Sequence, residues 1–398
     1  MNILSSACRT AVTLLRRTGF TPCHHVERCP PVRRLTPAAA LACLALLAAC
    51  STPYSPPEIL DANTRFPGLV DLPTQAEGRT ADVLLVHGIC TNDARWAQQV
   101  VAQLMASING ATMASVRSAK QDTNNIDIVP ATVETPAGRL RFNALIWSPL
   151  TTPLKRQLCY DQADKSAIYS GAPPYPHQRA LLNARLKDTL IDDCLPDALI
   201  YQGVAREAIQ LRMRDAILRV LADSDAPDNV PLVVIAHSMG SKIMFDTLLR
   251  MTQEAPGSHA ALAAQRTMAR MRILVMAANQ IPLLSLAEQT IEGATARTAQ
   301  PDSLQLLLQQ RGGEDRRRTM VPLTLVAFSD PNDPLSYTLP PERYAGQGVA
   351  VYNILVSNAP TWLGLLERPD YAHLDYLKNP EVGRLVACGV PASALCRH

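Results

Sequence analysis

Six short apolar runs, rich in valine, isoleucine and leucine, recur along the chain. They are Val83–Val86, Leu140–Trp147, Leu232–Ile235, Ile273–Met276, Leu323–Val326 and Val351–Val356. Runs this short and apolar are typical of strands that are buried on both faces of a sheet. Segments with helical spacing separate them, so consecutive strands would be joined by helical crossovers. This alternation predicts an α/β fold, with a mostly parallel sheet and helices on both of its faces.

Two of the separating segments carry clear helical patterns. After Asn92-Asp93, whose side chains can cap a helix, apolar residues recur at helical spacing until Asn109-Gly110, where glycine is a common helix terminator. A second helix is expected from about residue 205 to 221, where apolar side chains again repeat every three or four positions. Both helices present one apolar face, as expected for helices that cover a sheet.

Residues 151–200 interrupt the alternation of strands and helices. They contain a Pro- and Tyr-rich stretch, Tyr169–Pro176, and a short helical pattern, and we expect them to form an insertion over one end of the sheet. Residues 284–320 begin with a helical pattern, become polar and include Arg316–Arg318. A run of three arginines is most often a solvated loop, so we assign no ligand to it.

The first 49 residues have the features of an export signal. Residues 1–34 hold six arginines and one acidic residue, and the apolar run Leu35–Ala49 follows. This run is shorter than the ~20 residues that a helix needs to span a bilayer. A basic segment before a short apolar run is typical of a secretory signal peptide, so residues 1–49 are assigned to one. The leader is long for a signal peptide, and Val32 is a candidate for the true start.

The end of the apolar run, Leu47–Cys50, reads Leu-Ala-Ala-Cys and resembles a bacterial lipobox, whose cysteine becomes the lipidated N-terminus. The resemblance implies a lipid on Cys50. Residues 51–80, which begin rich in proline and serine, would then form a tether. A serine at position 51, directly after the cysteine, resembles the pattern in lipoproteins that are sent to the outer membrane and face the periplasm. An uncleaved membrane anchor and a buried apolar helix are the alternatives.

The positive net charge belongs to the predicted leader. The 398 residues include 38 Lys+Arg and 35 Asp+Glu, a formal net charge of +3. Without residues 1–49 the counts become 32 and 34, a net charge of −2. A protein with this charge gives no indication of nucleic-acid binding. We expect residues 81–398 to form one domain that includes the insertion.

Five cysteines remain outside the leader and the lipidation site. In an oxidising periplasm, Cys388–Cys396 and Cys159–Cys194 are candidate disulfides, which leaves Cys90 over. Spacing alone does not determine which cysteines pair. Five unpaired thiols buried as small apolar side chains are the alternative.

The most informative local motif is Ala236–Gly240, Ala-His-Ser-Met-Gly. It directly follows the apolar run Leu232–Ile235 and precedes a helical pattern. A small residue lies two positions before the serine and another lies two positions after it. This pattern, between a strand and a helix, is typical of a nucleophile elbow. The turn is so tight that it needs the small residues, and it projects the serine at the carboxyl edge of the sheet. Ser238 is therefore the candidate nucleophile.

His373 is the candidate base for Ser238. Of the eight histidines, it is the one that follows the last predicted strand; the others lie in the leader, at the C-terminus, in loops or directly after earlier strands. It also completes the chain order serine, aspartate, histidine that accompanies a nucleophile elbow. A surface or structural histidine is the alternative.

Two aspartates follow the strand that precedes the last one. Asp333 stands before Pro334-Leu335, and this segment resembles the Asp-x-hydrophobic turn that often carries the acid of a catalytic triad. Asp330 lies nearer the end of the strand and could instead hold the turn by bonding to its own backbone. Asp333 is favoured as the acid, and Asp330 is the alternative.

The segment His87-Gly88-Ile89 follows the first apolar run. Gly88 would let the backbone turn so that the amide of Ile89 faces the candidate site. Together with the amide of Met239, which follows Ser238, it would bind the oxyanion of an acyl-transfer intermediate. An ordinary loop after the strand is the alternative interpretation of this segment.

Taken in order, these motifs resemble the α/β-hydrolase superfamily over about residues 80–380. The resemblance implies that His373 deprotonates Ser238, that Asp333 orients the imidazole, and that the two amides stabilise a tetrahedral intermediate. It implies no metal and no cofactor, and it suggests a lid or substrate wall at residues 151–200. Few residues precede the first core strand, so the antiparallel strands usual at the N-terminal edge of this fold are expected to be missing or reduced.

We therefore expect a lipid-anchored serine hydrolase of the cell envelope that cleaves a carboxylic ester through an acyl-enzyme. An acyltransferase, thioesterase or amidase with the same triad is the first alternative. A non-catalytic interaction protein on the same fold is the second, since a fold alone does not determine function. The expected partners are a small-molecule acyl ester and the membrane, with no nucleic acid.

Overall fold

The computed structural model of the chain describes residues 50–116, 124–161, 177, 179–222, 229–291, 300–311, 322–345 and 347–397. The predicted signal peptide, residues 1–49, and the arginine run Arg316–Arg318 lie outside the described residues. The chain forms two compact units. The larger unit consists of Tyr54–Asn358 and the segment that begins at Pro369, and the smaller one includes residues 50–53 and Ala359–Arg368.

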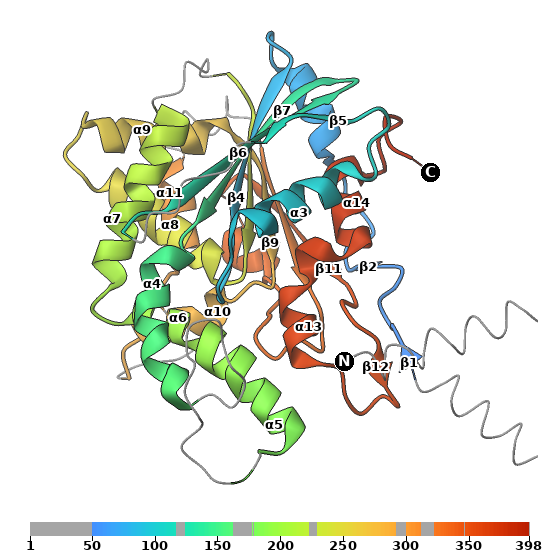
Figure 1. Cartoon of the computed structure of the whole chain (residues 1–398). Coiled ribbons are helices and arrows are strands. Elements are labelled where there is room, and N and C mark those ends of the chain that lie inside the picture. The colour runs from blue at the N-terminus through green and yellow to red at the C-terminus, as the bar shows by residue number, and fades with distance from the viewer. Residues whose placement is uncertain are drawn as a thin grey trace, which may run out of the picture. The chain divides into compact units, whose positions relative to one another are not determined.

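A nine-stranded sheet forms the centre of the larger unit (Figure 1). Its strands are β2 (Glu58–Ile59), β4 (Thr80–Val86), β5 (Thr112–Val116), β6 (Asp127–Thr135), β7 (Gly138–Ile146), β8 (Leu232–His237), β9 (Met271–Ala277), β10 (Leu323–Ser329) and β11 (Val349–Leu355). They lie in the order β2-β11-β10-β9-β8-β4-β7-β6-β5. The strands from β11 to β7 run parallel, whereas β2, β6 and β5 pair antiparallel with their neighbours. The predicted α/β fold with a mostly parallel sheet is confirmed.

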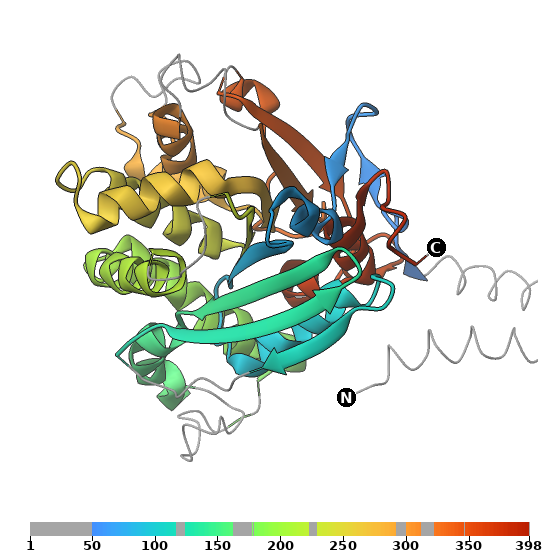
Figure 2. The same cartoon turned by 90° about the horizontal axis from the view of Figure 1, so that it is seen from above.

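Helices cover both faces of this sheet (Figure 2). One face carries α7 (Arg206–Ile217), α8 (Met239–Thr252), α9 (His259–Arg270) and α11 (Ser303–Arg311), and the other carries α3 (Ala94–Met105) and α14 (Pro380–Cys388). In β8, Val234 packs into the first core, whereas Val233 and Ile235 pack into the second. Side chains alternate across a strand, so a strand covered on both faces must be apolar throughout. Asp93 caps α3 with its side chain, as predicted.

One edge of the sheet is antiparallel, and β5 and β6 form it. The described segment before β4 adds only the two-residue strand β2 to this sheet, so the strands expected to be missing or reduced there are reduced, whereas β5 and β6 were not predicted. They come from a segment that follows β4 in the chain rather than preceding it. Buried and half-buried residues alternate along most of β6, as expected of a strand with one face on the core. Because an antiparallel pair needs only a short turn, β6 can join β7 directly.

Much of the predicted tether is part of the larger unit. Strand β2 pairs with β11 at the edge of the sheet. Strand β3 (Phe66–Pro67) pairs with β13 (Gly389–Val390). The helix η1 (Leu69–Gln75) then buries Leu69 and Leu72 completely. Residues 58–75, which were assigned to the tether of residues 50–80, therefore belong to the folded unit.

The insertion at residues 151–200 is helical where it is described. Its elements are α4 (Ser148–Lys155), η2 (Arg156–Asp161), α5 (Leu181–Arg185), η3 (Leu186–Cys194) and α6 (Leu195–Gln202). Helix α6 contacts both α4 and α7, and η3 contacts α13 (Pro369–Leu374). Figure 1 shows α4, α5 and α6 grouped at one end of the larger unit. The insertion thus lies at the end of the sheet where α13 is found.

Short helices complete the described segments. They are η4 (Leu218–Ala222), α10 (Ile281–Leu284), η5 (Ser285–Glu288), η6 (Pro341–Tyr344) and η7 (Tyr376–Lys378). In the smaller unit, β1 (Cys50–Ser51) pairs antiparallel with β12 (Thr361–Trp362). Within the described part of the chain, every helix is too short or too polar to cross a membrane.

Candidate active site

Ser238 lies in a strained turn between β8 and α8. Its φ of 53° and ψ of −128° are unusual for a residue other than glycine. A backbone conformation of this kind costs on the order of 1–3 kcal/mol and persists only where its surroundings enforce it. One constraint is close packing, because a Cβ on Gly240 would lie 2.4 Å from the carbonyl oxygen of His87. The small residue predicted after the serine is therefore a steric requirement.

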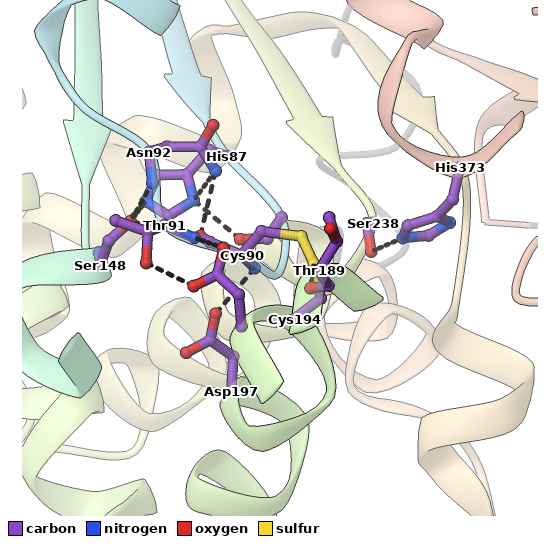
Figure 3. Close-up of a disulfide and its surroundings, with 12 residues drawn as sticks. His87, Cys90, Thr91, Asn92, Ser148, Thr189, Cys194, Asp197, Ser238 and His373 are labelled. Carbon is purple, nitrogen blue, oxygen red and sulfur yellow. Dashed lines mark hydrogen bonds between the residues drawn. A yellow bond between two sulfur atoms is a disulfide. The ribbon is translucent and has the colours of Figure 1, made fainter. Parts of the chain in front are cut away.

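A chain of hydrogen bonds joins Ser238, His373 and Asp333. The Oγ of Ser238 lies 3.0 Å from Nε2 of His373, and Nδ1 of His373 lies 2.9 Å from Oδ2 of Asp333. The carboxylate can only accept, so Nδ1 carries the proton and Nε2 is free to accept the proton of the serine hydroxyl. Figure 3 shows the contact between Ser238 and His373. The structure thus brings together the three residues predicted from the sequence.

The carboxylate of Asp333 also accepts two further hydrogen bonds. The Tyr376 hydroxyl donates to Oδ2 at 3.0 Å, and the amide of Leu335 donates to Oδ1 at 2.9 Å. Burial raises the pKa of Tyr376 well above its ordinary value, and the charge of Asp333 adds to this effect. Tyr376 is therefore protonated and acts as a donor. This role could not be predicted from the sequence, because a tyrosine three residues after a histidine is not part of a known motif.

Asp330 holds the turn through hydrogen bonds to backbone amides. Its Oδ1 accepts from the amide of Asn332 at 2.9 Å, and its Oδ2 accepts from the amide of Asn358 at 2.7 Å. Its own amide donates to the Tyr376 hydroxyl at 2.7 Å. The first of these bonds is the Asx-type turn considered for Asp330. The geometry therefore favours Asp333 over Asp330 as the partner of His373.

His237 supports the backbone of His373. Its Nε2–H donates to the carbonyl oxygen of His373 at 2.9 Å. Burial lowers the pKa of His237 to about 3, with a further contribution from the neighbouring His373. A neutral His237 side chain at the position before Ser238 thus fixes α13 relative to β8. The motif contained this histidine, but its role depends on a contact 136 residues away along the chain.

The amides of Ile89 and Met239 lie at the ends of adjacent parallel strands. In the register of β4 and β8, Val86 pairs with Ala236, and each amide belongs to the third residue beyond that pair. Both residues are buried. The amide of the next residue, Cys90, instead donates to Oδ2 of Asp197 at 2.8 Å. The structure therefore places both residues just beyond the ends of adjacent strands, whereas the amide of Cys90 is engaged with Asp197.

His87 fixes the loop that contains Ile89. Its Nε2 accepts from the amide of Trp147 at 2.9 Å, so Nδ1–H donates to the carbonyl oxygen of Gly88 at 2.7 Å. The imidazole also stacks on the Trp147 ring, with the two planes 2° apart. Burial lowers the pKa of His87 to about 3. A neutral imidazole thus ties the loop after β4 to the end of β7.

The stability of the folded chain is expected to decrease as pH falls below 6.5. Burial lowers the pKa values of His87 and His237 to about 3, against an ordinary histidine pKa of 6.5. Between these values the unfolded chain binds protons that the folded chain excludes, so lowering the pH favours unfolding. Each histidine can contribute a slope of up to about 1.4 kcal/mol per pH unit. Urea unfolding across this pH window measures the slope.

The variant His87→Asn provides the matched comparison for this titration. The free energy of unfolding of this variant should change less steeply with pH than that of the unchanged chain. The expected difference is the slope that corresponds to one proton, whatever the absolute stability of the variant. Equal slopes in the two proteins would show that His87 titrates alike in the folded and unfolded states.

Gly88 faces Ser238 at very close range. A Cβ at this position would lie 2.6 Å from Cβ of Ser238 and 2.8 Å from Nδ1 of His237. We expect Gly88→Ala to displace the serine and lower kcat for an ester substrate about 100-fold, the effect typical of a 1 Å displacement. Gly78→Ala is the control, because a Cβ there has nothing within 4 Å. Equal kcat values for the two variants would contradict the close packing described for Gly88.

A disulfide links the loop after β4 to the insertion (Figure 3). Cys90 is bonded to Cys194, although 104 residues separate them in the sequence. The predicted pairing of Cys194 with Cys159 is therefore wrong. The tertiary structure brings Cys194, at the end of η3, against the loop after β4. The predicted disulfide between Cys388 and Cys396 is confirmed.

An ion pair and hydrogen bonds reinforce this link. Lys155 Nζ lies 3.2 Å from Oδ2 of Asp197, the oxygen that accepts from the amide of Cys90. Lys155 and Asp197 are both buried. Asp193 accepts from the Thr91 amide at 3.1 Å and from its hydroxyl at 2.6 Å. The insertion therefore holds the loop next to Ile89 through a covalent bond and several polar contacts.

The insertion also lies against the segment that contains His373, because η3 contacts α13. Ser238 and His373 are both fully buried. The insertion therefore lies next to α13 as well as the loop after β4, and a lid or substrate wall at residues 151–200 stays a prediction. Atoms of Cys90, Asp193 and Cys194 gather within 4.8 Å of one another, a spacing that could suit a metal ion. Their two sulfurs form the disulfide, so they offer no thiolate ligand.

Comparison with known proteins gives few matches. No protein-family model and no curated protein matches the chain. One similar solved structure is YahD with malic acid, with a TM-score of 0.25 and 8% sequence identity over 69% of this chain and 83% of that chain. Another is acetyl xylan esterase 1 from Thermoanaerobacterium sp. JW/SL YS485, with a TM-score of 0.19 and 8% identity over 67% of this chain and 87% of that chain. Scores this low say nothing about the reaction, so function must be inferred from the residues around Ser238.

Proposed function

We propose that the protein is a serine hydrolase of the α/β-hydrolase type that cleaves carboxylic esters. The observation that carries the proposal is the hydrogen-bond chain from Asp333 through His373 to Ser238. Its serine stands at a positive φ between a strand and a helix. A base held in the correct tautomer beside an alcohol is the arrangement that makes a serine nucleophilic.

In the proposed reaction, His373 Nε2 takes the hydroxyl proton as Oγ of Ser238 bonds to the ester carbonyl carbon. The tetrahedral oxyanion would accept hydrogen bonds from the amides of Ile89 and Met239. Collapse breaks the bond to the alkoxy group, which leaves as an alcohol with the proton from His373. Water then attacks the acyl-enzyme by the same steps, releasing the acid and restoring Ser238. Asp333 would stabilise the imidazolium in both halves of the reaction.

A fluorophosphonate probe tests this proposal directly. We expect the probe to label Ser238, and the variant Ser238→Ala to remain unlabelled. A panel of p-nitrophenyl esters of increasing acyl length should then be hydrolysed at rates that do not depend on an added acceptor. A folded protein that the probe does not label would contradict the proposal and favour a non-catalytic role. A rate that depends on an added alcohol or amine would favour the acyltransferase alternative.

We also propose that a lipid on Cys50 anchors the protein to the outer membrane, facing the periplasm. The Leu-Ala-Ala-Cys sequence before Ser51 supports this location. Two disulfides in the larger unit also support it, because such bonds persist in oxidising compartments. Labelled palmitate should be incorporated into the protein and not into the variant Cys50→Ala. Incorporation that survives the substitution would rule out Cys50 as the lipidation site.

A further inference from the structure

The smaller unit exposes an unusual apolar hairpin, defined here as Thr361–Leu366. Its side chains Trp362, Leu363, Leu365 and Leu366 are 51%, 51%, 84% and 53% exposed. No charged residue occurs between Ala359 and Leu366. Large apolar side chains are scattered singly over most protein surfaces, whereas four within five residues form a continuous patch. Such a patch indicates a surface that contacts another apolar phase.

The backbone of the apolar hairpin keeps these side chains at its tip. The amide of Leu365 donates to the carbonyl oxygen of Trp362 at 2.9 Å. The amide of Trp362 donates to the carbonyl oxygen of Leu366 at 2.7 Å. Leu363 and Gly364, at the centre of the turn, have φ values of 52° and 66°. Turns of this type strongly prefer Asn-Gly. Leucine at the first position costs backbone energy and places an apolar side chain where a polar residue would fit better.

The apolar hairpin is joined to the residue that follows the apolar N-terminal run. In the pairing of β1 with β12, Cys50 lies opposite Trp362 and Ser51 lies opposite Thr361 (Figure 1). The hydroxyls of Ser51 and Thr361 lie 2.6 Å apart. If Leu35–Ala49 is removed and Cys50 is lipidated, residue 50 lies at the bilayer surface. If that run stays as a membrane anchor, residue 50 again lies there.

We propose that the apolar hairpin inserts into the phospholipid bilayer beside residue 50. The leucines would lie among the upper parts of the acyl chains, and Trp362 would lie at the interface, where tryptophan is enriched in membrane proteins. Burial of these side chains in the bilayer would remove from water the apolar surface that they now expose, which is energetically favourable. The proposal goes beyond the esterase function and does not depend on it, but it rests on the proposed attachment of the chain to the membrane at residue 50. It gives the protein a second contact with the membrane, in addition to the anchor.

A second copy of the chain is the other candidate for covering the apolar hairpin. Stable protein interfaces typically use about 20–30 residues on each side, whereas the hairpin offers six. An interfacial membrane contact needs only a few large apolar side chains next to an anchor. The size of the patch and its pairing with residue 50 therefore favour the bilayer.

The tryptophans of the chain provide a direct test. The chain has three, of which Trp147 is fully buried and Trp96 is half-buried in α3, so Trp362 is the exposed one. The full-length protein, purified from membranes, is reconstituted into vesicles of phosphatidylethanolamine and phosphatidylglycerol with brominated acyl chains. We expect bromine to quench part of the tryptophan fluorescence. The variant Trp362→Phe should lose this quenching, which assigns it to the hairpin.

A matched pair of variants separates the apolar hairpin from other exposed leucines. Leu365→Asp should lose most of the quenching of Trp362, whereas Leu262→Asp, on the exposed side of α9, should retain it. The proposal would be overturned if the protein sedimented with the vesicles but bromine did not quench Trp362. It would also be overturned if the protein did not sediment with the vesicles. A dimer without vesicles that Leu365→Asp dissociates would also overturn it. Hydrolysis of a soluble short-chain ester, measured on the same samples, reports separately on the esterase function.

Discussion

Asparagine in place of Asp333 is expected to lower kcat for ester hydrolysis about ten-thousandfold, the effect that this substitution has in other Ser-His-Asp triads. The carboxylate accepts from Nδ1 of His373 at 2.9 Å and so keeps Nε2 unprotonated beside Ser238. An asparagine amide can donate to Nδ1 instead. The remaining ring proton would then lie on Nε2, which could no longer accept from the serine. The kcat for p-nitrophenyl acetate and a circular dichroism spectrum of the variant check this expectation.

Asp330→Asn is the matched control, since it makes the same chemical change three residues away. Asp330 accepts backbone hydrogen bonds from Asn332 and Asn358, whereas Nδ1 of His373 is held by Asp333. The substitution should leave kcat nearly unchanged and lower the free energy of unfolding by about 1 kcal/mol, the value of one hydrogen bond. If Asp330→Asn abolished turnover in a folded protein while Asp333→Asn remained active, the assignment of the acid would be wrong.

Removal of the disulfide between Cys90 and Cys194 is expected to cost up to about 4.7 kcal/mol of stability. The bond closes a loop of 104 residues, and in the chain-entropy description the stabilisation grows with the length of the closed loop. It also holds the segment beside Ile89, whose amide would bind the oxyanion. The double variant Cys90→Ser, Cys194→Ser should therefore lose kcat as well, by about 100-fold if that amide is displaced. Urea unfolding and ester kinetics measure the two effects.

The disulfide between Cys388 and Cys396 provides the comparison. It closes a loop of only 8 residues, so its removal should cost about 2.5 kcal/mol in the same description. It lies away from Ser238, and kcat should be preserved in the folded fraction. Non-reducing peptide mapping should recover Cys90 linked to Cys194. A peptide that links Cys159 to Cys194 instead would overturn both the pairing and the expected loss of activity.

The strand pattern and the serine motif could be predicted because they depend on neighbouring residues. Apolar runs such as Leu232–Ile235 indicate a parallel strand because both of its faces are covered, and this requirement applies along the whole segment. Glycine is required at position 240, two residues after Ser238, because a side chain there would collide with the backbone of His87. The order of the motifs along the chain was enough to select His373, and the resemblance of Asp333–Leu335 to a turn that often carries the triad acid favoured Asp333.

Other features could not be predicted because they arise between segments that are distant in sequence. Tyr376 gains its contact with Asp333 only because η7 and the loop after β10 meet beside β8. The edge strands β5 and β6 follow β4, although the resemblance suggested that such strands should precede it. Tertiary structure also paired Cys90 with Cys194, because folding brings the insertion against the loop after β4.

The sequence by itself determined the α/β class, the sharp turn at Ser238 and the selection of His373 as its partner. These features follow from hydrophobic periodicity and local steric limits, which act within a few residues. Only the tertiary structure decided between Asp333 and Asp330, because both follow the same strand and just one of them reaches His373. It also decided what surrounds the serine, since hydrogen bonds and a disulfide between remote segments depend on how the chain packs.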